Sequence, residues 1–225
     1  MRENRLGQSN VYDLFARVTK AYVPLADLRF RALLGAERWA QLPEAVQKRF
    51  SKRLSGAASI TYSGEVVECR ISRIGWLLAN ALRLIGAPLP LAGDTLVPAI
   101  VTVTEDEASG GQFWTRHYGH HRGFPQVIHS TKRFAGATGL EEYIGGGVGV
   151  ALTLDVREGA LMFLSDHYFI ALGRWRLRIP KWMSPGHLTV GHVDCGDGWF
   201  AFTLALEHKL LGTLIAQTAL FADAR

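Results

Sequence analysis

The chain has 225 residues, of which 48% are hydrophobic and 20% charged, so it can bury a sizeable core. No apolar run reaches the roughly 18 residues of a membrane-spanning helix, and the first residues form no apolar signal segment, so we expect neither a membrane span nor secretion. The two cysteines lie far apart, as reduced thiols of a cytoplasmic protein would. The net charge of +5 resides in residues 1–56, where 11 Lys and Arg face 5 acids. This predicts a solvated helical surface and no nucleic-acid partner; attraction to an anionic membrane or nucleic acid is the less favoured alternative.

Three helices are predicted in the first part of the chain. Residues 9–22 place apolar side chains at 11, 14, 15 and 18, which is the spacing of one helix face, and Pro24 ends this stretch. Two further helices are expected over residues 26–34 and 43–54. Their apolar sides require a sheet to cover them.

A strand is predicted over residues 58–71, and Gly64 in its middle indicates a bulge or a bend. A helix over residues 74–85 follows, with Gly86 and Pro88 as its C-terminal signals. This helix has a broad apolar face. It could therefore close the mouth of a barrel or lie against an outer face.

The rest of the chain indicates antiparallel strands separated by short turns. Eight candidates lie at 97–105, 111–119, 124–134, 148–157, 160–172, 174–179, 187–195 and 198–208. Turns such as Gly196-Asp-Gly198 are too short for parallel crossovers, so neighbouring strands must form hairpins. Residues 138–144 are open between a short helix and a strand. Residues 210–217 predict a short helix, and 218–221 a closing strand.

We therefore expect a single β-dominated α+β domain over residues 1–225. It consists of a helical segment over 1–56 and an antiparallel sheet over 57–225, with an inserted helix near 74–86. An up-and-down sheet of about 8–10 strands has to curl or close to hide its edges, which predicts a curved sheet or a partly closed barrel. Its concave side could hold an apolar cavity or be filled by the N-terminal helices.

Several motifs resemble a known family when they are taken as a set. They are Gly75-Trp-Leu77 followed by Gly86-Ala-Pro88, then Phe113-Trp-Thr-Arg-His-Tyr118, residues 172–185, Asp197-Gly-Trp-Phe-Ala-Phe202 and Leu210-Leu-Gly212. The chain is similar, from about Tyr12 to Phe221, to the bacterial domain of unknown function family 4166. Members occur alone or fused to saccharopine-dehydrogenase-like reductase domains. The resemblance implies a reductase partner in trans, because this chain has no GxGxxG motif after a strand, and it implies no catalytic residues.

The candidate binding residues lie on two of the predicted strands. Trp114, Arg116 and Tyr118 alternate, so they share one face of a strand. An inward guanidinium between two aromatic side chains could bind a carboxylate or phosphate head group. A protein carboxylate, such as Glu105, Asp155 or Asp166, would be the structural alternative. His192 completes the set, because Asp194 shares its face and could orient the imidazole as a base.

The other polar residues are expected mainly at the surface, with an inward arginine face on residues 174–178 as the less favoured alternative. The histidines form no HExxH motif and no paired Cys/His spacing, so we expect no metal and no other cofactor. Arg174, Arg176 and Arg178 predict an exposed face, with the alternating Trp175, Leu177 and Ile179 packed inward. Lys132, Glu141 and Glu142 are expected at the surface.

Three functions are compatible with these patterns. We favour a binding module that holds a hydrophobic or lipid-like molecule in a sheet-lined pocket, because catalytic motifs are absent and aromatic side chains face inward. The first alternative is an enzyme or an accessory domain that works with a nucleotide-dependent reductase. The second is a structural or interaction domain, with Trp182 and Met183 as contacts. The sequence identifies no catalytic residue and does not decide whether the protein is an enzyme.

Overall fold

The computed structural model describes residues 25–55, 58–86 and 88–223. The predicted helix over residues 9–22 lies outside these residues. A two-stranded sheet joins β1 (Leu25–Ala26) to β2 (Lys52–Arg53), and all other described strands belong to one large sheet.

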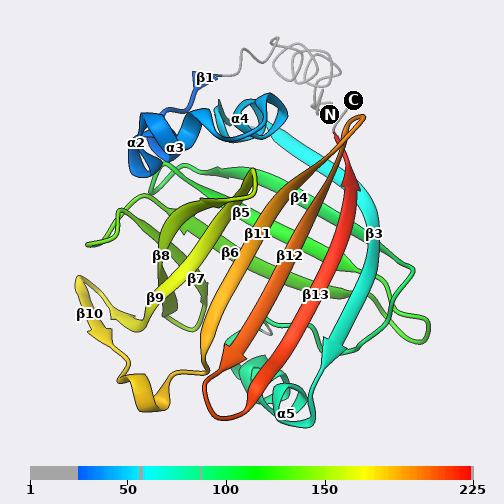
Figure 1. The fold of residues 1–225 in the computed structure, drawn as a ribbon. Helices are drawn as coiled ribbons and strands as arrows, with labels where there is room; N and C mark the ends of the chain where they lie inside the picture. Colours follow the sequence, from blue (N-terminus) through cyan, green and yellow to red (C-terminus); the bar gives the residue numbers. More distant parts are fainter. Residues whose placement is uncertain (1–24, 56–57, 87, 224–225) are drawn as a thin grey trace, which may run out of the picture.

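Ten antiparallel strands of that sheet close into a barrel (Figure 1). They are β3 (Ser59–Ile71), β4 (Val97–Asp106), β5 (Gly111–Tyr118), β6 (Gln126–Arg133), β7 (Leu140–Gly145), β8 (Val148–Arg157), β9 (Ala160–Leu172), β11 (His187–Gly196), β12 (Trp199–His208) and β13 (Gly212–Ala222). Each pairs with its neighbour along the chain, apart from the interposed β10 (Trp175–Arg178), and β13 returns to β3. The β-dominated up-and-down architecture predicted from the sequence is confirmed.

Short helices lie at the two ends of the barrel (Figure 1). The helices α2 (Arg29–Leu34), α3 (Ala36–Ala40) and α4 (Glu44–Phe50) lie at one end and bury apolar side chains against the strands. At the other end lie α5 (Arg73–Ala81), the 3-10 turn η1 (Leu82–Ile85) and the 3-10 turn η2 (Lys181–Met183). The Ser72 hydroxyl accepts a hydrogen bond from the Gly75 amide and so caps α5. The core is thus filled from one end by helices, which leaves space nearer the other.

Two local predictions were wrong. Residues 210–217 do not form a helix: Gly212 begins β13 after a turn, and pairing with β12 and β3 on both sides holds this segment extended. Trp175 and Leu177 do not pack inward but are 65% and 54% exposed, because β10 lies outside the barrel ring. The expected exposure of Arg174 and Arg178 is confirmed, and residues 138–144 contribute a strand.

The sequence predicted a bulge or a bend at Gly64, but the pairing irregularity of β3 lies elsewhere in the strand. The pairing register shifts between Glu68 and Val66, opposite Thr218 and Ala219. Gly64 has another purpose, because a Cβ there would collide with the backbone carbonyl of Leu220 on β13. The missing side chain permits the close approach of β3 and β13, the pair that closes the barrel.

Gly64→Ala is therefore expected to lower the free energy of unfolding by about 1–3 kcal/mol, because backbone atoms cannot move aside as a flexible side chain can. Urea unfolding of the variant and the wild type measures the change. Ser63→Ala, next to it on the exposed face, is the matched control and should stay within about 0.5 kcal/mol of the wild type. Equal stability of the two variants would contradict this account of the barrel closure.

Candidate ligand-binding cavity

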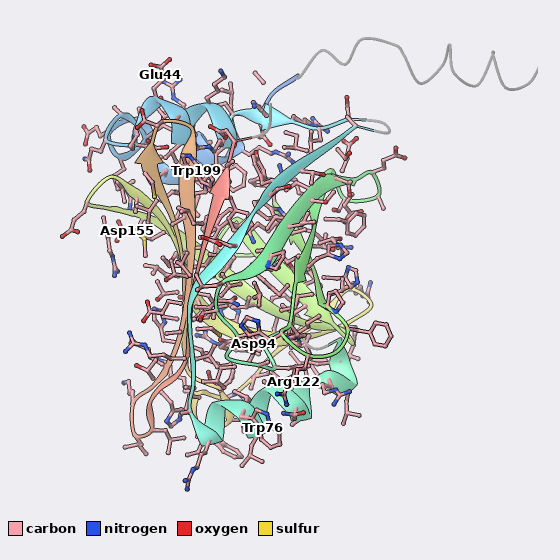
Figure 2. All side chains as sticks on the ribbon, turned by 90° about the vertical axis from the view of Figure 1, so that its right-hand side faces the viewer. Glu44, Trp76, Asp94, Arg122, Asp155 and Trp199 are labelled. Carbon is pink, nitrogen blue, oxygen red and sulfur yellow. The ribbon has the colours of Figure 1, made fainter. Side chains whose placement is uncertain are left out.

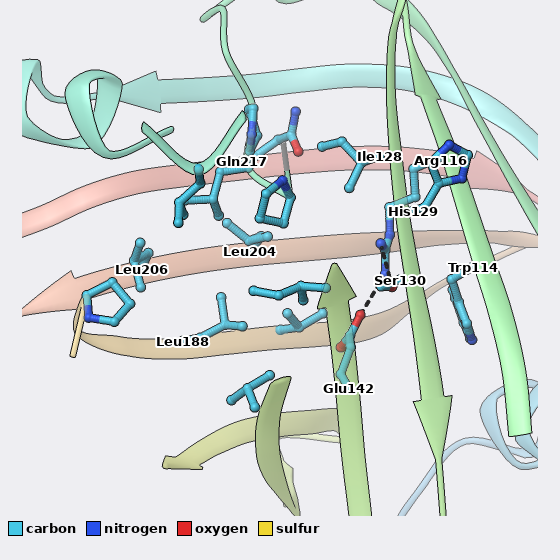
Figure 3. Close-up of a pocket in the computed structure, with 18 of the residues that line it drawn as sticks. Trp114, Arg116, Ile128, His129, Ser130, Glu142, Leu188, Leu204, Leu206 and Gln217 are labelled. Atoms are coloured by element: carbon cyan, nitrogen blue, oxygen red, sulfur yellow. Dashed lines mark hydrogen bonds and ion pairs between the residues drawn. The ribbon is translucent and has the colours of Figure 1, made fainter. Parts of the chain in front are cut away.

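The barrel encloses a cavity of about 310 Å³ near the end covered by α5. Its lining combines the inward faces of the strands with apolar side chains of α5, η1 and η2, among them Leu78, Leu82, Ile85 and Met183. Leu188, Leu204 and Leu206 form one apolar wall, which is visible in Figure 3. Most residues that line the cavity are apolar, as in many ligand pockets.

A cluster of three charged side chains interrupts this apolar lining. Arg116 on β5, Lys132 on β6 and Glu142 on β7 all line the cavity, and Figure 3 shows Arg116, Ser130 and Glu142 converging. The Lys132 ammonium lies 2.8 Å from one Glu142 oxygen, whereas the nearest Arg116 nitrogen lies 3.4 Å from the other. A second Arg116 nitrogen donates to the Ser130 hydroxyl at 3.1 Å. Two basic side chains thus share one carboxylate beside an apolar cavity.

The pKa values agree with this arrangement. Burial alone would raise the pKa of Glu142, but Lys132 and Arg116 outweigh it and hold that pKa at about 2. Burial lowers the pKa of Lys132, and the nearby Arg116 lowers it further, against the attraction of Glu142. The carboxylate is therefore ionised at neutral pH, and it is stabilised by both cations.

Aromatic rings surround the two cations. The Lys132 ammonium lies 4.9 Å from the centroid of the Trp114 ring and 5.3 Å from that of Phe163. The Arg116 guanidinium lies 5.8 Å from the Trp114 centroid. These distances fall within the range of cation–π attraction, which offsets part of the cost of burying the charges.

The structure brings together three of the four predicted site residues. Trp114, Arg116 and Tyr118 line the cavity from successive inward positions of β5. Trp114 is buried, and burial raises the pKa of the Tyr118 hydroxyl. None of the carboxylates named as alternative partners pairs with Arg116, but Glu142 does. A protein carboxylate therefore satisfies part of the hydrogen-bonding capacity of the Arg116 guanidinium.

His192, the fourth residue, lies outside this cavity. Its ring stacks on Phe200 with centroids 4.8 Å apart and meets Phe50 edge-on, inside the aromatic core. Burial and the neighbouring Arg49 lower its pKa to about 3, so the imidazole is neutral. Asp194 does not orient it, because that carboxylate pairs with Arg49 at 3.0 Å. Its Nδ1 atom has no hydrogen-bond partner among the described residues.

The prediction that Lys132, Glu141 and Glu142 lie at the surface was wrong, since all three are buried. Lys132 and Glu142 are directly paired across β6 and β7 and point into the barrel. Glu141, on the opposite face of β7, pairs with Arg176 of β10 at 2.8 Å. One signal in the sequence was available: Lys132 alternates with Ile128 and Ser130, which fixes it on the same inward face.

The described residues contain no cluster of His, Cys, Asp or Glu that could hold a metal ion. Within the same residues no helix is long and apolar enough to cross a membrane.

Fold and cavity together define a closed antiparallel barrel with a charged cluster at an internal apolar cavity.

Comparison with known proteins identifies the family. The family described as Domain of unknown function (DUF4166) matches residues 42–221, and the chain belongs to it. Searches of curated proteins and of solved structures found no significant match.

Proposed function

We propose that the barrel binds a small amphipathic molecule with an apolar body and one acidic head group. The apolar body would occupy the space lined by Leu188, Leu204 and Leu206, and the acidic head would meet the charged cluster. The observation that carries this proposal is the pairing of two cations with a single carboxylate in an otherwise apolar cavity. A ligand carboxylate would neutralise the excess charge, which is costly to bury alone.

Arg116 is the cation that would receive the head group. Its contact with Glu142 is longer than that of Lys132, and its side chain is 20% exposed against 4% for Lys132. A guanidinium carries five N–H donors, and its contacts with Ser130 and Glu142 involve one terminal nitrogen each. Arg116 can therefore donate further hydrogen bonds to a ligand carboxylate and keep both of these contacts.

Three probes with the same alkyl chain test the proposal by calorimetric titration. Decanoate should bind the wild-type protein with one-to-one stoichiometry, decanol more weakly, and decyltrimethylammonium the least, because only decanoate adds the charge that the cluster lacks. Equal affinity for decanoate and the cationic probe would refute the acidic-head proposal. Absence of binding by all three probes would refute a hydrophobic ligand of this size.

A further inference from the structure

The barrel end that bears α5 carries an unusual surface. We call it the α5 end: residues 71–96, the β5–β6 turn (119–125), the connection from β9 to β11 (172–187) and the β12–β13 turn (207–213). Figure 2 places Trp76 and Arg122 toward this end, and Glu44 and Trp199 toward the other. Figure 1 shows the β12–β13 turn beside α5, η2 at the same end of the barrel, and β10 at the side of the barrel above η2.

Exposed apolar side chains gather at the α5 end. Of the 20 exposed large apolar residues in the described part of the chain, 13 lie in these four segments. The most protruding include Leu84 (93% exposed), Leu210 (88%) and Trp182 (82%). Single exposed apolar residues are ordinary, but a concentration on one end of a molecule indicates an interaction surface.

The elements that cover the cavity are apolar on both sides. Leu78 and Leu82 point from α5 and η1 into the cavity, whereas Leu77 and Leu84 of the same elements face outward and are exposed. The apolar outward side is therefore not needed to fill the barrel. It requires a separate explanation.

Basic residues are interleaved with these apolar side chains. The four segments hold eight Lys and Arg against two acids, Asp94 and Glu207. Asp94 is already engaged by His120 at 2.9 Å. Six of the cations are exposed and form no ion pair with another described residue: Arg73, Arg83, Arg122, Arg174, Lys181 and Lys209.

We propose that the α5 end docks onto the surface of a bilayer that contains anionic lipids. Trp182, Leu84 and Leu210 would enter the boundary between head groups and acyl chains, and the surrounding cations would contact the lipid phosphates. A second copy of this chain does not fit equally well. A symmetric dimer through this surface would bring its own cations face to face.

Vesicle co-sedimentation of the whole 225-residue chain tests this proposal. Wild type should bind vesicles of phosphatidylcholine with phosphatidylglycerol, bind pure phosphatidylcholine weakly, and dissociate at high salt. Each basic residue near an anionic surface strengthens binding by roughly fivefold, so Arg83→Gln, Arg122→Gln and Lys209→Gln together should weaken binding by roughly a hundredfold. Leu84→Ser with Trp182→Ser should also remove most of the bound fraction.

Matched changes at the other end are the controls. Arg31→Gln, Lys48→Gln and Arg157→Gln together, and separately Trp199→Ser, should leave vesicle binding as in wild type. The proposal is overturned if wild type binds neither vesicle type, or if the control variants lose as much binding as the α5-end variants. It is also overturned if light scattering shows a dimer that Leu84→Ser with Trp182→Ser dissociates, with no vesicle binding. Arg116→Met should bind vesicles normally, which separates this proposal from that for the cavity.

Discussion

Glu142→Gln is expected to lower the free energy of unfolding by about 3–5 kcal/mol, because it leaves the buried Lys132 and Arg116 without their shared anion. Urea unfolding at neutral pH measures this loss. Glu65→Gln, an exposed substitution of the same kind, is the control and should change stability by less than about 0.5 kcal/mol. Saturating decanoate should recover more stability in Glu142→Gln than in the wild type, since the ligand supplies the missing negative charge. A loss no larger than that of the control would contradict the buried cluster.

The difference in unfolding free energy between wild type and Glu142→Gln is expected to depend on pH. The pKa of Glu142 is about 2 in the folded protein and about 4.5 when unperturbed, so the unfolded state binds the proton more readily between these values. The stabilisation by the carboxylate is thus fully present above about pH 4.5, and it is lost as the pH falls toward 2. The stability difference between wild type and Glu142→Gln should shrink over this range. A stability difference that does not change with pH would contradict the lowered pKa of Glu142.

Arg116→Met is expected to weaken decanoate binding by about ten- to a hundredfold, the value of one charge-assisted hydrogen-bonded contact, and to leave decanol binding unchanged. The fold should persist, because the variant keeps the Lys132–Glu142 ion pair. Parallel calorimetric titrations with the two probes measure the effect. Arg174→Met in the turn before β10, an exposed arginine that does not line the cavity, is the matched control. Unchanged decanoate affinity in Arg116→Met would show that Arg116 does not bind the head group.

The strands could be predicted because their signals are local. The bounds expected for β8 and β9 match the structure, since period-two apolar residues and glycine turns delimit them. A helix was wrongly predicted over residues 210–217, because the apolar residues at 210, 211, 214 and 215 also fit helical spacing. Pairing with two neighbouring strands decides between these structures, and that information is not local.

The candidate site could be predicted only in part, for a related reason. Alternation correctly grouped Trp114, Arg116 and Tyr118 on one inward face. Glu142 could not be assigned to Arg116, because the cross-strand register that joins β5, β6 and β7 follows from the closed barrel. His192 also points inward, but a strand face does not reveal whether it meets open space or solid core. The reductase partnership implied by the family resemblance stays a prediction.

The central claim is that an acidic head group is ionised beside Arg116 inside the barrel. Nuclear magnetic resonance of decanoate labelled with carbon-13 at its carboxyl carbon tests this claim directly. The bound carboxyl signal should be distinct from the free one, titrate at lower pH than decanoate in water, and show contacts with the Trp114 ring. In Arg116→Met the downward pKa shift should disappear. A bound signal that titrates as in water, or no bound signal in the wild-type protein, would contradict the account.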